Sequence, residues 1–186
     1  MKNFFKKLLG ITTALAIVGG ATMSSAEAKS LVVYYSATGN TKIAALKIAA
    51  LTKSDVLELV PAHQYTDADL DYTDKSSRVC RENTDKSIRD NTLVTATVKD
   101  FDSYDTIFVG YPIWWDTYAW PVDGFLGVNN LQGKTIYPFC TSGGSSVDGS
   151  VASLRANYKD AKIVDGMRIY RNTSVSEIQN WIDSQK

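Results

Sequence analysis

Beyond position 28, short continuous apolar runs alternate with longer, more polar segments. The runs are rich in Val, Ile and aromatic residues, as in strands that are buried on both faces of a parallel sheet. They predict five strands, at residues 30–35, 55–60, 105–110, 134–140 and 161–169.

The segments between these runs favour helices. In residues 41–53 the apolar side chains lie near one stripe of a helix. Residues 174–185 begin with a capping box, because Ser174 is followed by Glu177 three residues later. Further helices are predicted around residues 69–83, 121–127 and 146–158. Alternating strands and helices predict an α/β fold, a three-layer sandwich with a parallel sheet and helices on both faces.

The first 28 residues have the pattern of a secretory signal peptide. Three lysines precede the apolar residues 8–21, and Ala26 and Ala28 form an A-x-A cleavage pattern. We therefore expect cleavage after Ala28 and a single domain at residues 29–186. The alternative is an uncleaved membrane anchor, for which the apolar segment is short. The expected product is exported, periplasmic or secreted, and makes no membrane contact after cleavage.

The charge balance restricts the possible partners. Residues 29–186 contain 17 basic and 19 acidic residues, because three of the 20 basic and one of the 20 acidic residues precede them. A net charge of −2 argues against binding to nucleic acid or to an anionic membrane surface.

The cysteines and the single histidine do not form a recognisable site. Cys80 and Cys140 are 60 residues apart and belong to no CxxC motif. Export would permit a disulfide, but we expect both thiols to stay unpaired. His63 has no Cys or carboxylate at ligand spacing and is expected at the surface, so no metal site is predicted.

Ligands of parallel α/β sheets bind beyond the carboxyl ends of the strands, so the loops after the first, third and fourth predicted strands are informative. The first loop, residues 36–41, reads SATGNT and joins a strand to a helix N-terminus. Free N–H groups and the helix dipole favour an anion there. The loop contains no Lys or Arg and matches neither a P-loop nor a dinucleotide fingerprint, so a phosphate monoester held by neutral donors is the expected ligand.

The second and third loops complete a candidate site. The second loop, residues 110–121, carries three tryptophans and a tyrosine within seven residues, which can form a platform for a planar ring. The third loop, residues 140–150, reads CTSGGSSVDGS and offers hydroxyl groups and accessible backbone amides. A capped turn, core aromatics and a flexible connection are the plain alternatives. Together, the three loops predict a site for a phosphorylated flat heterocycle.

In this order the three stretches resemble the flavodoxins. SATGNT is similar to their FMN-phosphate loop, and YPIWW and CTSGGSS are similar to the two loops that hold the isoalloxazine ring. The resemblance covers residues 31–170 and implies a five-stranded sheet of order 2-1-3-4-5, with FMN as the cofactor. The cofactor-binding residues that it implies are Ser36, Ala37, Thr38, Gly39, Asn40, Thr41, Pro112, Ile113, Trp114, Trp115, Asp116, Thr141, Ser142, Gly143, Gly144 and Ser145.

The resemblance implies an FMN-binding electron-transfer protein that serves a redox partner protein or a small electron acceptor. The alternative is an FMN-dependent NAD(P)H or quinone oxidoreductase, although no residue stands out as catalytic. A phospho-receiver module is a third possibility, but the first loop lacks the acidic residues that it would need.

Two features depart from the family pattern. Asp116 follows the Trp pair where the resemblance leads us to expect Gly. In flavodoxins a loop peptide commonly flips to bond the reduced ring, and the Cβ and charge of Asp116 would oppose that flip and an anionic reduced ring. The third loop contains no aromatic residue, so one face of the ring is expected to be open. Only one of Trp114 and Trp115 is expected to stack on the ring.

Overall fold

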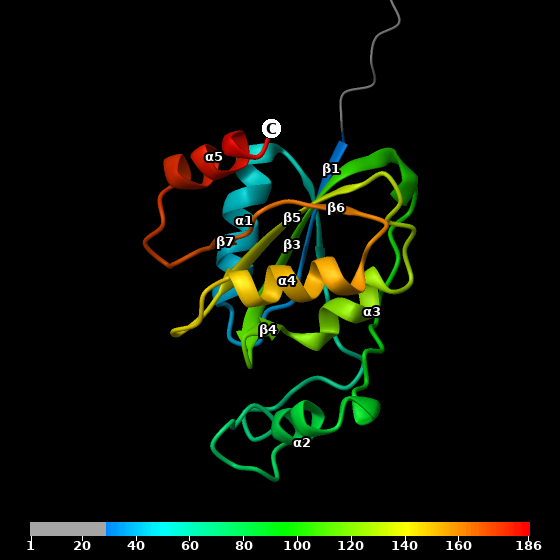
Figure 1. Cartoon of the computed structure of the whole chain (residues 1–186), viewed down its shortest axis with the longest axis vertical. Coiled ribbons are helices and arrows are strands. Elements are labelled where there is room, and N and C mark those ends of the chain that lie inside the picture. The colour runs from blue at the N-terminus through cyan, green and yellow to red at the C-terminus, as the bar shows by residue number, and fades with distance from the viewer. Residues whose placement is uncertain (1–28) are drawn as a thin grey trace, which may run out of the picture.

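The computed structural model describes residues 29–186 (Figure 1). The predicted signal peptide lies outside the described residues. Within them, a parallel sheet pairs in the order β2-β1-β3-β5-β6, and β7 also pairs with β5. The strands are β1 (Lys29–Tyr34), β2 (Asp55–Glu58), β3 (Tyr104–Trp114), β4 (Thr117–Tyr118), β5 (Thr135–Thr141), β6 (Lys162–Ile163) and β7 (Met167–Arg168).

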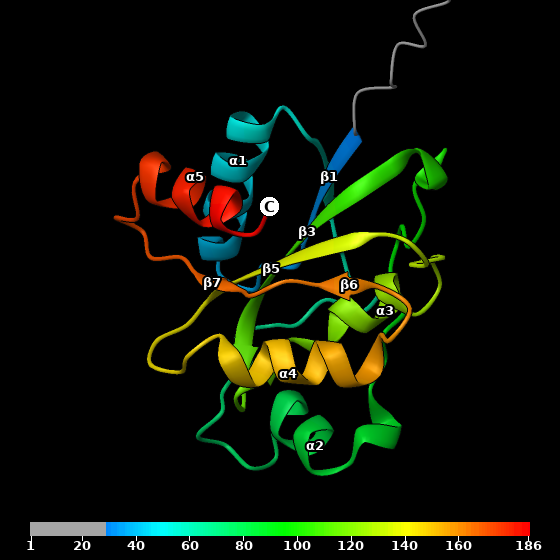
Figure 2. The ribbon, with the colours of Figure 1, turned by 45° about the horizontal axis from the view of Figure 1, so that its top comes forward.

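Helices cover both faces of the sheet, which confirms the predicted α/β sandwich. Figure 2 shows α1 and α5 on one side and α3 and α4 on the other. The helices are α1 (Asn40–Thr52), α2 (Arg78–Thr84), α3 (Asp123–Leu126), α4 (Asp148–Asn157) and α5 (Val175–Ser184), with short 3₁₀ turns at Lys86–Ile88, Phe101–Ser103 and Trp120–Val122. No helix in residues 29–186 is long and apolar enough to cross a membrane.

Alternation along the inner strand β1 explains the two helical layers. Leu31 and Val33 point into the core that packs under α3 and α4, whereas Val32 and Tyr34 point into the core under α1 and α5. All four side chains are buried, so residues 31–34 of β1 are apolar at successive positions instead of every second one. Helix α5 begins with the predicted capping box of Ser174 and Glu177.

The helix predicted around residues 69–83 is largely wrong. Only Arg78–Thr84 is helical, and turns precede it. Asp71 and Asp74 each accept hydrogen bonds from the backbone N–H and the hydroxyl of the residue two positions later. Such local bonds compete with helix formation. The polar segment between β2 and β3, residues 62–100, is here called the α2 segment, and its helix lies beyond the carboxyl edge of the sheet (Figure 1).

The predicted last strand, residues 161–169, is split into β6 and β7. Ile136 pairs with Ile163 and Phe139 pairs with Met167, so the break lies beside Pro138 of β5. Proline has no N–H to donate to the ladder, which accounts for the interruption. Both β6 and β7 still extend the parallel sheet beyond β5.

Strand β4 was not predicted. It forms an antiparallel hairpin with the end of β3, in which Trp114 pairs with Thr117 and only Trp115 and Asp116 form the turn. Their φ angles are 45° and 58°. Positive φ at both central residues is the pattern of a type I′ turn, which matches the twist of a hairpin but normally favours Asn-Gly.

The hairpin also explains a glycine inside α4. A Cβ placed on Gly149 would lie 2.6 Å from the carbonyl oxygen of Asp116. Glycine at this position lets the hairpin turn approach the helix, and this accounts for its presence in a helix that it would otherwise weaken.

Candidate functional site

Strands β1, β3 and β5 lie side by side, so their loops meet at the carboxyl edge of the sheet. The loops surround a pocket of about 480 Å³. The predicted residues that line it are Thr38 and Asn40 from the first loop, Pro112, Ile113 and Trp114 from the second, and Thr141, Ser142 and Gly143 from the third. The structure therefore brings together all three stretches that the sequence singled out.

The first loop presents an array of neutral donors at the start of α1. Gly39 has a φ of 82°, which lets the chain turn sharply into the helix. The Lys42 N–H donates to the Ser36 hydroxyl at 3.2 Å, and the Asn40 side chain donates to the Thr38 hydroxyl at 3.1 Å. Within the described part of the chain, the N–H groups of Asn40 and Thr41 have no hydrogen-bond partner. They remain available to an anion at this helix N-terminus.

A partly buried pair of hydroxyl groups joins the first and third loops. Thr41 is 1% exposed and does not line the pocket, and its hydroxyl lies 2.8 Å from that of Thr141. This bond holds the first loop against the third loop. Because Thr141 lines the pocket, the bond also positions a residue of the pocket wall.

Arg168 of β7 holds the third loop and was missed in the sequence. Its guanidinium donates to the carbonyl oxygens of Ser142 and Gly144, both at 2.8 Å. The resulting loop directs Gly143 toward the pocket, whereas Gly144 lies outside its lining. Nothing in the local sequence links residues so far apart, so only the tertiary structure shows this contact.

The two adjacent tryptophans of the second loop have different environments. Trp114 lines the pocket, and its ring packs edge-on against Tyr35, Tyr65 and Trp120 at centroid distances of 4.9–5.6 Å. Trp115 is 43% exposed, lies outside the lining and stacks on Trp120 at 6.1 Å. Trp114 is therefore the residue of the pair that is placed to contact a ligand.

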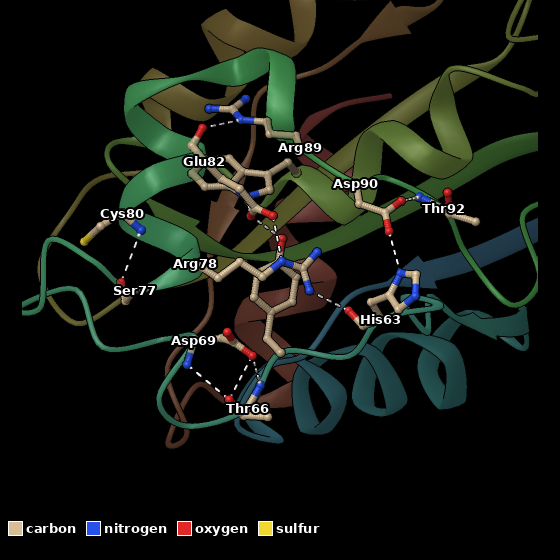
Figure 3. Close-up of polar contacts among 12 residues, drawn as sticks. His63, Thr66, Asp69, Ser77, Arg78, Cys80, Glu82, Arg89, Asp90 and Thr92 are labelled. Carbon is tan, nitrogen blue, oxygen red and sulfur yellow. Dashed lines mark hydrogen bonds and ion pairs between the residues drawn. The ribbon is translucent and has the colours of Figure 1, made fainter.

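A buried carboxylate bonds two of the aromatic side chains that pack on Trp114. Glu82 of α2 is 2% exposed, and one of its oxygens accepts hydrogen bonds from the Tyr65 hydroxyl at 2.6 Å and the Trp120 indole at 2.8 Å. The other oxygen pairs with Arg78 at 2.7 Å. Figure 3 shows Arg78 and Glu82 at the centre of the contacts made by the α2 segment, with Arg89 reaching the backbone of Glu82. The ion pair lies within α2, and the hydrogen bonds that Glu82 accepts from Tyr65 and Trp120 join α2 to the residues that pack on Trp114.

Several predicted residues shape the loops without lining the pocket. Asp116 is at the exposed turn of the β3–β4 hairpin and Trp115 precedes it. The other predicted residues that lie outside the lining are Ser36, Ala37, Gly39, Thr41, Gly144 and Ser145. Their roles in ligand binding stay predictions.

Other pocket residues come from parts of the chain that the sequence did not indicate. Tyr72 of the α2 segment is 77% exposed, and Tyr170 from the loop after β7 is 52% exposed. The remaining ones are Ile43, Ala44, Lys47, Ile169 and Arg171. They reach the pocket from the side of α1 and from two polar loops, and no local motif marks them.

The cysteines and the histidine lie as expected. Cys80 and Cys140 are both free. Burial raises the pKa of the Cys140 thiol to about 12, which makes it a poor nucleophile. His63 is at the surface, where its ring lies 2.7 Å from Asp90 and holds the pKa of that carboxyl well below its usual range.

The family model described as Flavodoxin matches residues 29–185. The chain belongs to the flavodoxin family. No curated protein sequence is significantly similar to it. Among solved structures, a candidate flavoprotein from Bacteroides eggerthii is 38% identical, with a TM-score of 0.80 over 86% of this chain and 98% of that one. A second candidate flavoprotein, from Bacteroides uniformis, is 36% identical, with a TM-score of 0.77 over 84% and 98%.

A more distant flavodoxin-like fold is that of a flavoprotein from Lactobacillus acidophilus, solved in complex with FMN. It is 22% identical to this chain, with a TM-score of 0.63 over 84% of this chain and 99% of that one. At this identity, the likeness is one of fold.

Proposed function

We propose that this flavodoxin-family protein binds FMN and transfers electrons between a redox partner protein and an acceptor. The observation that carries the proposal is the meeting of the three loops around one pocket, with the start of α1 on one side and Trp114 on another. Membership of the flavodoxin family and the FMN in the Lactobacillus acidophilus relative support the choice of cofactor.

The donor set fits the phosphate of FMN. The Thr38 hydroxyl and the free N–H groups of Asn40 and Thr41 are neutral donors at a helix N-terminus, which suits a phosphate monoester. The pocket volume of about 480 Å³ is within the usual range of small-molecule sites.

The ring would pack on the apolar wall formed by Pro112, Ile113 and Trp114, with Thr141, Ser142 and Gly143 supplying polar groups. When bound, FMN supplies the redox chemistry, and the protein binds it, orients it and limits its contact with water. The wall is rigid because Trp114 is held by neighbouring aromatic rings.

An FMN-dependent NAD(P)H or quinone oxidoreductase is the second candidate. The third loop has no aromatic residue, and Gly143 and Gly144 face open space, so the loop leaves room for a substrate beside the ring. Oxidation of NAD(P)H by the purified flavin-loaded protein, with or without a quinone, would favour this enzyme. Electron exchange only with a partner protein or a small acceptor would favour the carrier.

The binding test compares FMN with riboflavin, which lacks the phosphate. Thr38→Ala should weaken FMN binding about tenfold or more, because a hydrogen bond to a charged group contributes about 1.5–3 kcal/mol. Riboflavin binding should stay within twofold of the wild type. Thr95→Ala, an exposed threonine outside the pocket, is the matched control. Failure of the wild type to bind FMN would refute the proposal, and equal losses for both ligands would refute the phosphate assignment.

We also propose that the first 28 residues direct export and are then removed. Expression of the full chain in an exporting host, followed by sequencing of the mature N-terminus, should give a protein that begins at Lys29. Recovery of the full-length chain in the membrane fraction would support the anchor instead.

A further inference from the structure

An arginine from the far end of the chain reaches the first loop. Arg171 follows β7, and its guanidinium donates to the side-chain oxygen of Asn40 at 3.2 Å, across 131 positions of sequence. Asn40 in turn donates to the Thr38 hydroxyl at 3.1 Å. A chain of contacts therefore runs from a cationic group to a donor that lines the pocket.

The backbone of Arg171 is held against α1. The ammonium group of Lys47 donates to the carbonyl oxygens of Arg171 and Thr173, both at 3.1 Å. Thr173 is buried, and its hydroxyl accepts the Tyr170 N–H at 2.8 Å. These contacts fix the loop that carries Arg171, so its side chain starts from a defined position beside the first loop.

The charge of Arg171 is not neutralised by the protein. Among residues 29–186, no carboxylate forms an ion pair with it. The ionisable residues that line the pocket with it are Lys47, which is cationic, and Tyr72 and Tyr170, and no Asp or Glu belongs to the lining. The pocket thus carries two positive charges beside a helix N-terminus, an environment that favours an anion with more than one negative charge.

We propose that Arg171 is a binding residue for the phosphate dianion of FMN. Its guanidinium would contact the phosphate in addition to the neutral donors of the first loop. The inference rests on the proposed function. Arginine is suited to this role because its planar guanidinium can donate two hydrogen bonds to one phosphate and stays charged at any working pH. Asn40 holds the guanidinium beside the loop, and the remaining N–H groups stay free for the ligand.

A cation at this position gives the protein a preference for the doubly charged phosphate. The second pKa of a phosphate monoester is about 6. Binding of FMN by the wild type should therefore strengthen as the pH rises from 5 to 7.5, because the ligand gains a charge while Arg171 keeps its own. It should also weaken with added salt, since Arg171 is exposed and its attraction is screened.

The experiment titrates the purified protein, freed of flavin, with FMN and with riboflavin and follows flavin fluorescence. Arg171→Gln should bind FMN about three- to tenfold more weakly at pH 7.5 and low salt, with a weaker dependence on pH and salt than the wild type, because Lys47 remains as the second cation of the pocket. Riboflavin binding should change less than twofold. Arg171→Lys should keep the salt dependence, because the charge remains. The control is Arg155→Gln, which removes an exposed arginine of α4 that pairs with Asp165 outside the pocket.

The outcomes separate the inference from the proposed function. If the wild type binds FMN, and Arg171→Gln has the same affinity and salt dependence, the inference is overturned while the proposed function stands. Equal weakening of FMN and riboflavin would overturn it too, since Arg171 would then shape the pocket without recognising phosphate. If the wild type binds no flavin, the proposed function fails and the inference fails with it.

Discussion

Replacing Glu82 by glutamine tests whether its buried carboxylate joins the α2 segment to Trp120, which packs on Trp114. The Glu82 side chain is 3% exposed and that of its partner Arg78 is 15% exposed. Glutamine has nearly the same shape but no charge. Its amide nitrogen must face either Arg78 or the side chains of Tyr65 and Trp120. The Arg78 guanidinium and the Trp120 indole are donors only, so in either orientation one of them loses its acceptor.

The expected loss in free energy of unfolding is about 3 kcal/mol. Breaking a buried ion pair from one side typically costs about 3–5 kcal/mol, because the other charge is left unpaired. The lower end applies here, since Arg78 keeps a bond to the His63 carbonyl oxygen at 2.7 Å. For a domain of this size, the loss corresponds to a fall in melting temperature of about 6–12 °C.

Urea unfolding, followed by tryptophan fluorescence, measures this loss. Glu58→Gln is the control, because it also removes a carboxylate paired with a cation, at 38% side-chain exposure, and should cost less than about 1 kcal/mol. The double variant Arg78→Met/Glu82→Gln should lose less stability than the sum of its single variants, since neither charge is then left alone. If Glu82→Gln unfolds at the same urea concentration as Glu58→Gln, the buried carboxylate of Glu82 does not secure the α2 segment.

Three further predictions follow from the pocket and its surroundings. Trp114→Ala should raise the fluorescence of bound FMN by removing a stacked quencher, whereas Trp115→Ala should leave it unchanged and cost about 1 kcal/mol of stability; the reverse result would exchange their roles. Asp116→Gly should raise the free energy of unfolding by about 0.5–1 kcal/mol by relieving a positive φ, and Asp116→Asn should be neutral. An equal rise in the free energy of unfolding for both variants would indicate that the charge of Asp116, and not its backbone conformation, is unfavourable. A thiol reagent at pH 8 should label Cys80 and spare Cys140 until urea unfolds the protein, because burial raises the pKa of Cys140; rapid labelling of both would show that the core opens.

The sheet and the three loops could be predicted because their signals are local. Strand β1 is apolar at successive positions since both of its faces are buried, and Ser174 and Glu177 mark the start of α5 within four residues. The loops were recognised by hydroxyl groups, glycines and aromatic residues that directly follow strands. Their meeting in one pocket then follows from the geometry of a parallel sheet.

The α2 segment was misread although its sequence contained a usable signal. Asp-x-Ser or Asp-x-Thr occurs four times in it, beginning at Asp71, Asp74, Asp85 and Asp90. In each case the carboxylate accepts the N–H of the residue two positions later. This repeated local bond predicts turns and outweighs helix propensity.

The contributions of Arg171, Arg168 and Glu82 could not be predicted from the sequence. Arg171 reaches the first loop across 131 positions, and Arg168 supports the third loop from a neighbouring strand. Glu82 looks like an ordinary surface residue of a polar segment, and only its burial beside Trp120 reveals its role. Such contacts depend on how distant segments pack, which no local pattern encodes.

The direction of the strands has a practical consequence for joining this protein to other molecules. Strand β1 begins at the edge of the sheet opposite the loops, and the C-terminus lies on the same side (Figure 1). A linker attached at residue 29 or at residue 186 would therefore leave the pocket facing the solution. A partner domain fused at either end would have to reach around the sheet to cover it, whereas an electrode or support attached there would hold the pocket outward.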